Sequence, residues 1–289
     1  MNSFLMVWKK MQKVLIWIMI GACCIFLCLY LWKRNADKHI YEAPDYYKAD
    51  LRELLSHKEL SQEDYTFLFW QTGLPEKTLK KMIAEGKEEM IYRIQDRFFV
   101  KSVPVCAKNS VISWEEWNAE EEDKIIFADL EDGDILITPC SHTFGWRNGH
   151  AAIVVDAKEG ETLESVVLGT KSSLQYLDKW EMYPCVMVFR LKGVSEEIRA
   201  QIAQSAKENL CGIDYGLEMG FLFPAYGTEM TAKTHCAHLV WYAYRSFGYD
   251  LDSDGGRIVT PKDISKSPFL ELVQVVGADP EKLWKYFSI

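Results

Sequence analysis

Residues 14–32, VLIWIMIGACCIFLCLYLW, form a run of nineteen residues without a charged side chain. At about 1.5 Å per residue, a helix of this length crosses the roughly 30 Å of hydrocarbon in a bilayer. The run ends in Tyr30, Leu31 and Trp32, and aromatic residues suit the membrane interface. A cleaved signal peptide usually has a shorter apolar core that is followed by small residues. We therefore predict a single-pass membrane anchor, with residues 1–32 forming a cytoplasmic stub and the transmembrane helix.

The flanking charges of this apolar run do not set its orientation. Three lysines precede the run, and three basic residues follow it at positions 33, 34 and 38, so the positive-inside count nearly ties. The box IGAC, which ends at Cys23, is similar to a lipoprotein processing site, but cleavage there would leave the apolar segment CIFLCLYLW at the start of the mature chain. Cleavage and lipidation stay open as alternatives to an anchor.

The rest of the chain is acidic and contains an odd number of cysteines. Residues 1–32 carry three lysines and no acid, so the net charge of -9 for the whole chain becomes -12 for residues 33–289. An acidic body repels nucleic acid and anionic membrane surfaces, so no nucleic-acid partner is expected. The body has no CxxC pair, which argues against a zinc ribbon or a thioredoxin-type site, and at least one of its five thiols must be free. These are Cys106, Cys140, Cys185, Cys211 and Cys236.

The hydrophobic pattern divides the body near residue 129. Residues 33–44 are expected to be a polar tether, and residues 45–128 a small helical segment with a capping box from Ser61 to Asp64 and a break at Gly73. Residues 129–289 begin with short β-like runs at 134–138, 150–156, 162–169 and 185–192, and glycines in the turns between them favour an antiparallel sheet. A helix from about 195 to 210 follows. This order predicts an α+β domain at 129–289.

A further helix is predicted in the segment THCAHLVWYAYRSFG, with Thr234 as its N-cap and Gly248 as its stop. Cys236 then lies in the first turn. Unsatisfied backbone N–H groups at a helix start stabilise a thiolate, and they can also hold an oxyanion. A thiolate nucleophile needs a base, and His150 is the best candidate, because it opens an apolar strand after the flexible RNG segment.

Other interpretations of these residues stay open. Cys236 could be a small core residue, since free cysteines are commonly buried. His142 could be the base in place of His150. His235 and His238 flank Cys236, but neighbouring side chains in one helical turn point around the axis and cannot both face one metal ion with it. No metal and no cofactor are therefore predicted.

The segments GDILIT, NGHAAIVVD, TLES, GIDYG and THCAHLVWYAY occur in this order within about residues 129–270. Their order and spacing resemble the circularly permuted branch of the NlpC-type papain-like cysteine hydrolases, the YiiX-like proteins, in which the histidine strand precedes the cysteine helix. The resemblance implies a permuted papain-like domain with an antiparallel sheet and packed helices. It implies that Cys236 is the nucleophile and His150 the base.

Two further roles come from the same resemblance. Glu164, in TLES, aligns with the residue that orients the imidazole, although a shift of register would put Leu168 there. Tyr215, in GIDYG, aligns with a tyrosine that lines the substrate-binding site. From the residues themselves, Glu164 could equally be a solvent-facing strand residue, and Tyr215 could pack in the core.

The function that the resemblance implies is a membrane-anchored cysteine hydrolase that cleaves amide bonds without a cofactor. Peptide bonds of cell-wall peptidoglycan are the implied substrate, and this requires an extracytoplasmic catalytic domain. Permuted relatives also include lipid-directed amidases and acyltransferases, so a lipid amide or ester is an alternative substrate. A catalytically inactive module that binds an envelope ligand is an alternative of a different class.

Overall fold

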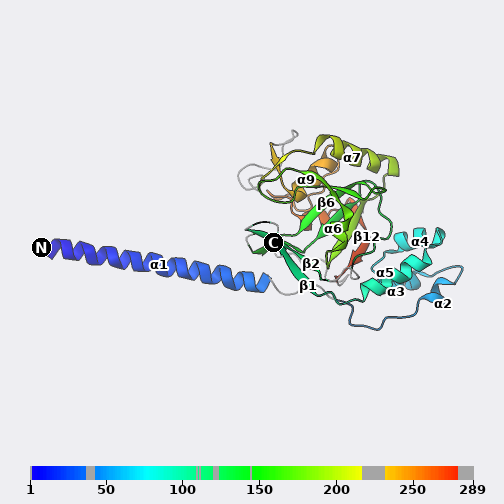
Figure 1. Ribbon diagram of the computed structural model, residues 1–289, viewed down its shortest axis with the longest axis horizontal. Helices are drawn as coiled ribbons and strands as arrows, with labels where there is room; N and C mark the ends of the chain where they lie inside the picture. Colours follow the sequence, from blue (N-terminus) through cyan, green and yellow to red (C-terminus); the bar gives the residue numbers. More distant parts are fainter. Residues whose placement is uncertain are drawn as a thin grey trace. The chain divides into compact units, whose positions relative to one another are not determined.

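The chain divides into two units, residues 1–39 and residues 40–289. The first unit contains α1 (Asn2–Ala36), and the second contains the sheets and the other helices (Figure 1). The computed structural model describes residues 2–36, 43–108, 110, 112–119, 124–143, 145–216 and 232–278.

The apolar run at 14–32 lies within α1 and is helical, as predicted. The stretch Lys10–Leu31 is long and apolar enough to cross a membrane, and its side chains are not buried by other parts of the protein. A signal sequence near the N-terminus meets the same criteria, so the anchor and its orientation stay predictions. Of the tether expected at 33–44, the first four residues continue α1, and residues 37–42 lie outside the described part.

Six antiparallel strands form the main sheet, in the order β12-β9-β3-β6-β7-β8. All residues of the central strands β3 and β9 are buried, so the middle of the sheet is covered on both faces. Two helices, α7 (Glu196–Asn209) and α9 (Cys236–Arg245), pack against β6 (Figure 1). The predicted α+β class with an antiparallel sheet is confirmed. The strands are β3 (Ile135–Thr138), β6 (His150–Asp156), β7 (Glu161–Glu164), β8 (Ser173–Tyr176), β9 (Val186–Leu191) and β12 (Leu270–Val276).

The predicted strands match the observed ones best where the run of apolar residues is continuous. The run predicted at 150–156 coincides with β6. The run predicted at 162–169 is wrong in its second half, because β7 ends at Glu164. A turn follows, in which the Thr170 amide donates to the carbonyl of Val167 and Gly169 adopts a φ of +91°. Such a positive φ is costly for other residues, so a glycine suits this turn between β7 and β8.

The segment predicted to be helical at 45–128 is helical only in its first part. Its helices are α2 (Arg52–Leu55), α3 (Gln62–Thr72), α4 (Glu76–Ala84) and α5 (Glu88–Phe98). The Ser61–Asp64 capping box and the stop at Gly73 are both present. Residues 104–108 and 113–118 instead form two strands of a second antiparallel sheet, ordered β1-β2-β4-β5, because β2 pairs with a strand that is distant in sequence. These strands are β1 (Pro104–Lys108), β2 (Ser113–Asn118), β4 (Ser141–Thr143) and β5 (Trp146–Arg147).

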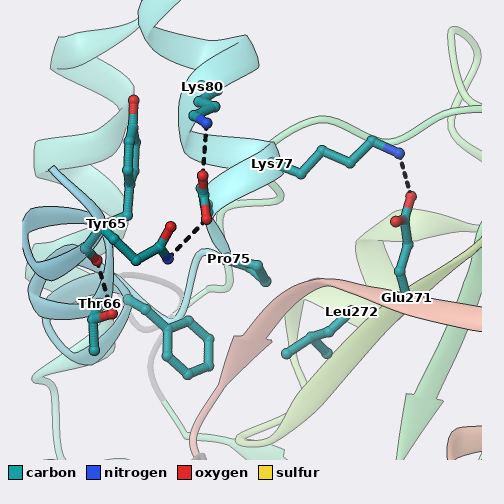
Figure 2. Close-up of a pocket in the computed structure, with 10 residues that line it drawn as sticks. Tyr65, Thr66, Pro75, Lys77, Lys80, Glu271 and Leu272 are labelled. Carbon is teal, nitrogen blue, oxygen red and sulfur yellow. Dashed lines mark hydrogen bonds and ion pairs between the residues drawn. The ribbon is translucent and has the colours of Figure 1, made fainter. Parts of the chain in front are cut away.

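The helical segment has its own apolar cluster, built on residues such as Leu68, Leu79 and Ile91, and it also contacts the main sheet. The amide of Val275 in β12 donates to the carbonyl of Gly73 at 2.9 Å. A cavity of about 660 Å³ lies between α3, α4 and β12, and ion pairs inside it already satisfy its charged side chains (Figure 2). Residues 40–289 form one compact unit, and a domain boundary near residue 129 stays a prediction.

Candidate active site

Cys236 lies in the first turn of α9, as predicted, but the helix is capped by a different residue. The N-cap is His235, whose backbone is extended and whose Nδ1 accepts from the amide of His238 at 3.4 Å. Thr234 instead ends the short strand β11 (Lys233–Thr234), and its hydroxyl lies 2.9 Å from Nδ1 of His238. The pairing of β11 with β10 (Asp214–Tyr215) holds Thr234 in extended conformation, so the helix begins one residue later than the sequence indicates.

His150 is the first residue of β6, directly after Gly149, whose φ is +73°. It pairs with Thr138 at the end of β3. The Nε2 atom of His150 lies 2.6 Å from Oε2 of Glu164, and both side chains are almost completely buried. The expectation that Glu164 could face solvent is therefore wrong: this side chain is 0% exposed, because Glu164 ends β7 on the side that faces His150.

The Glu164 carboxylate is held by three more side chains. Its Oε1 accepts from the Thr162 hydroxyl at 2.8 Å and from Nε1 of Trp180 at 2.7 Å. Nζ of Lys179 lies 3.4 Å from its Oε2. The ring of Trp180 also stacks on the imidazole of His150, with centroids 5.5 Å apart and planes inclined by 17°. The imidazole is thus fixed both at its edge and on its face.

The thiol of Cys236 and the imidazole of His150 form an acid–base pair. Burial favours the neutral thiol, but hydrogen bonds and charges from His150 and His235 outweigh it and lower the pKa of Cys236 to about 5. Burial also favours a neutral imidazole, but the interactions of His150 with Cys236 and Glu164 raise its pKa to about 9. Because Glu164 occupies Nε2, we infer that the hydrogen bond between His150 and Cys236 uses the other ring nitrogen, Nδ1. Both shifts favour the thiolate–imidazolium form of the pair.

Tyr215, in β10, is buried and close enough to Cys236 for the thiolate charge to act on it. Burial, and then this charge, raise the pKa of its hydroxyl. The structure therefore brings all four residues of the predicted site together, since Cys236, His150, Glu164 and Tyr215 share one neighbourhood. Whether Tyr215 binds substrate stays a prediction.

His142, the alternative base, lies elsewhere. It belongs to β4 in the second sheet, where its ring stacks on Trp114 at a centroid distance of 4.9 Å. Its Nε2 lies 3.4 Å from a carboxylate oxygen of Glu116. The geometry therefore favours His150 over His142 as the partner of Cys236.

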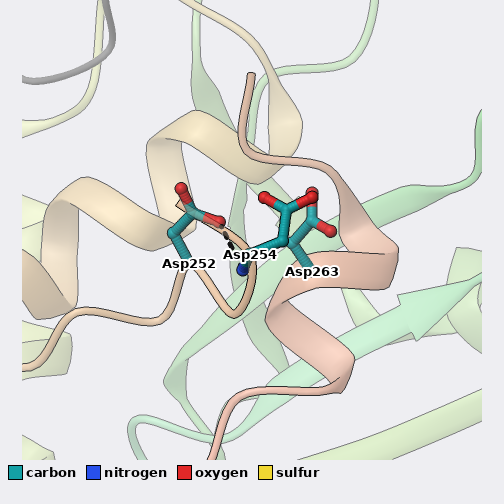
Figure 3. Close-up of side chains that lie close together, drawn as sticks. All are labelled: Asp252, Asp254 and Asp263. Carbon is teal, nitrogen blue, oxygen red and sulfur yellow. Dashed lines mark hydrogen bonds between the residues drawn. The ribbon is translucent and has the colours of Figure 1, made fainter. Parts of the chain in front are cut away.

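One group of carboxylates among the described residues has the spacing of a cation site. The ligand oxygens of Asp252, Asp254 and Asp263 lie within 4.8 Å of one another (Figure 3). The spacing D-x-D-x-D-G that begins at Asp250 is typical of calcium loops, and no cation site was predicted from it. The group follows the C-terminal end of α9, whereas Cys236 lies at its N-terminal end. Exposed acidic groups of this kind are common without an ion.

The short helix α6 (Leu177–Glu181) and the capping role of His235 were not predicted from the sequence. Lys179 and Trp180, which contact Glu164, are neighbours on this five-residue helix. A short polar helix between two strands carries no periodic signal, so only the fold places these two side chains at the site. His235 could have been recognised as an N-cap, because its side chain precedes the helix and can accept a backbone hydrogen bond.

Comparisons with known proteins give little further information. No family model matches the sequence, and no curated protein matches it. Among solved structures, the chain is similar to the crystal structure of the metalloprotein YiiX from Escherichia coli O157:H7, with 15% sequence identity and a TM-score of 0.36 over 50% of this chain and 96% of that one. A likeness of this size carries no argument about the chemistry of this chain. The roles of the site residues rest on the geometry above.

Proposed function

We propose that the body of this protein is a thiol hydrolase that cleaves amide bonds, built on a permuted papain-like fold. One observation carries the proposal: Cys236, at the start of α9, faces an imidazole whose other nitrogen binds the buried carboxylate of Glu164. This is the arrangement of nucleophile, base and orienting group that acyl transfer requires. A cysteine that only fills the core has no need of a charged partner.

The reaction begins with the thiolate of Cys236, which attacks the carbonyl carbon of the amide and forms a C–S bond. The backbone N–H groups in the first turn of α9 stabilise the resulting oxyanion. The imidazolium of His150 donates its proton to the leaving nitrogen as the C–N bond breaks. A water molecule then attacks the thioester, His150 takes its proton, and cleavage of the C–S bond releases the acid and restores the ion pair.

Glu164 orients this imidazole and stabilises its charged form. Its own pKa is lowered by the charges and hydrogen bonds of Lys179, His150 and Trp180, which together overcome the effect of burial. It therefore stays ionised throughout the working pH range. Tyr215, beside the thiolate, would line the cleft that receives the substrate.

Peptide amides of peptidoglycan are the substrate that we propose. The net charge of -12 on residues 33–289 supports a neutral or amidated peptide over an anionic lipid surface, because like charges disfavour close approach. With α1 as a membrane anchor, the body would then lie outside the cytoplasm. A lipid amide or ester, and simple binding without catalysis, are the alternatives that an experiment must distinguish.

The experiment uses the full-length protein in detergent micelles. It is incubated with purified muropeptides and, separately, with phospholipids and N-acylated lipids in mixed micelles, and the products are identified by mass spectrometry. Cys236→Ala is the control. We expect muropeptide cleavage that depends on Cys236. Turnover of lipid alone would replace the proposed substrate, and Cys236-independent or absent turnover of both would contradict the hydrolase and favour a binding module.

A further inference from the structure

The helix α6 places a cation against the orienting carboxylate of the site. Nζ of Lys179 lies 3.4 Å from Oε2 of Glu164 and 3.4 Å from Oε1 of Glu115. Glu115 belongs to β2 in the second sheet, and its side chain is 1% exposed. It accepts a hydrogen bond of 2.7 Å from the hydroxyl of Tyr183. One ammonium group therefore bridges two buried carboxylates that come from different sheets.

The joint ionisation of two buried carboxylates depends strongly on the cation between them. Their oxygens are each 3.4 Å from Nζ, so they lie within about 7 Å of each other by simple geometry. Like charges this close, in a site removed from water, resist joint ionisation. Burial would raise the pKa of Glu164, and the charge of Lys179 is the strongest influence that lowers it instead. Lys179 itself stays protonated, because the two carboxylates outweigh the effect of burial on its pKa.

The ionisable groups around this cation form one connected set. His150 and Trp180 contact Glu164, Cys236 contacts His150, and His235 contacts Cys236. With both carboxylates and the thiolate ionised, and with Lys179 and His150 protonated, these five groups carry a net charge of about -1. Loss of Lys179 makes this charge more negative by one. A proton is then taken up more readily by one of the anions.

We propose that Lys179 is a positioning residue of the hydrolase site: its ammonium group, shared between Glu164 and Glu115, keeps the thiolate–imidazolium pair intact at acidic pH. This inference rests on the proposed function. Protonation of Glu164 removes the partner that charges and orients His150, and protonation of Cys236 removes the nucleophile. The acid limb is the pH range in which the alkylation rate of Cys236 falls as the pH falls. Either event moves this acid limb to higher pH. Only uptake of the proton by Glu115 would leave that limb in place.

Neutralising Glu115 removes this alternative site for the proton and therefore gives the sharpest test. Glu115→Gln keeps an oxygen that accepts from Tyr183 and leaves Lys179 to Glu164 alone. In this background, Lys179→Met preserves the length of the side chain and removes its charge. The proton can then go only to Glu164 or Cys236. We therefore expect the acid limb to rise by about one pH unit or more when Lys179→Met is added to Glu115→Gln.

The measurement is the rate constant for alkylation of Cys236 by iodoacetamide from pH 4 to 10, on the full-length protein in detergent, with peptide mapping by mass spectrometry. Lys179→Arg keeps the cation and should leave the limb within about 0.3 pH units of the wild type. Circular dichroism checks that each variant is folded. The Glu115→Gln background has one buried charge fewer, so it keeps the test usable if Lys179→Met alone does not fold.

The outcomes separate this inference from the proposed function. If the acid limb of Glu115→Gln lies at low pH and does not move when Lys179→Met is added, the role of Lys179 is overturned, but the proposed hydrolase is not. This holds even if the alkylation rate falls equally at all pH values. An acid limb near that of a free thiol, about 8.5, in the wild type contradicts the ion pair itself and the inference with it. A shift of the acid limb to higher pH in the double variant, relative to Glu115→Gln, with no such shift in Lys179→Arg, supports the proposal.

Discussion

Removal of the His150 imidazole should convert Cys236 from a preformed thiolate into an ordinary thiol. With a pKa of about 5, the wild-type thiol is about nine-tenths ionised at pH 6. A thiol with the ordinary value of about 8.5 is ionised to less than ~1% at that pH, so the thiolate population should fall about 300-fold in His150→Ala.

The rate of alkylation should fall by less than the thiolate population. A more basic thiolate is a better nucleophile, with a Brønsted slope of about 0.4–0.5 over about 3.5 pKa units, and this recovers roughly 25- to 55-fold. The net loss at pH 6 is therefore about tenfold, and at pH 5 about 40-fold. The two pH–rate profiles differ more in shape than in absolute rate. The wild-type alkylation rate should be nearly flat from about pH 6 to 8, whereas the rate of the variant should increase about tenfold per pH unit.

Iodoacetamide labelling of the full-length protein in detergent, quenched at short times and mapped by mass spectrometry, measures these rates for each thiol at once. Cys236 is 7% exposed, which slows its absolute rate but not its pH dependence. The buried thiols Cys140 and Cys185 should stay unlabelled, because burial raises the pKa of Cys140 to about 12 and that of Cys185 as well. Cys106 and Cys211, both exposed, are the internal references.

Two results would refute the reasoning. Faster labelling of Cys140 or Cys211 than of Cys236 at pH 5–6 would show that the nucleophile is misassigned. A Cys236 rate that climbs tenfold per pH unit up to pH 8 in the wild type would show that no ion pair exists. In either case the contact between the start of α9 and His150 would not activate the thiol.

Three further predictions test the surroundings of the site and the fold. Glu164→Gln should lower the turnover of amide substrate less than His150→Ala does, because an orienting group tunes the imidazole while the base transfers the proton; wild-type turnover in both Glu164→Gln and Glu164→Ala would mean that another residue orients His150. Trp180→Phe keeps an aromatic ring on His150 but loses the hydrogen bond to Glu164. A hydrogen bond to a charged group contributes about 1.5 kcal/mol, so kcat should fall about 10-fold. An unchanged kcat would mean that Trp180 contributes only by packing. Gly73→Ala should lower the free energy of unfolding by more than about 2 kcal/mol in urea titrations, because φ is +71° and the added Cβ would lie 2.0 Å from the carbonyl oxygen of Val275; wild-type stability would show that the junction with β12 yields at little cost.

Local sequence signals correctly predicted the two elements that carry Cys236 and His150. The first turn of α9 follows from the amphipathic pattern of THCAHLVWYAYRSFG, although the helix begins one residue later than predicted, and the start of β6 follows from the apolar run after Gly149. The Ser61–Asp64 capping box was readable for the same reason: its hydrogen bonds join residues three apart. Signals of this kind act within a few residues, so an isolated sequence contains all the information that they need.

Side-chain direction in the strands was less accessible. Successive residues of a strand point to opposite faces, so the position of Glu164 follows from its register, but which face is buried depends on what covers it. β8 pairs with the edge of β7, and Trp180 of α6 donates a hydrogen bond to the carboxylate of Glu164. A carboxylate that could have faced solvent became the buried partner of His150.

The sequence by itself determined the apolar helix at the N-terminus, the acidic charge of the body, and the placement of Cys236 and His150 at the starts of regular elements. The tertiary structure alone decided what surrounds them. Lys179 and Glu115 lie 64 positions apart in the chain, on a short helix and on a strand that was expected to be helical, and Lys179 contacts both Glu115 and Glu164. A buried ion cluster assembled by long-range strand pairing leaves no periodic mark in the sequence, because each of its charged residues, read alone, looks like an ordinary solvated side chain.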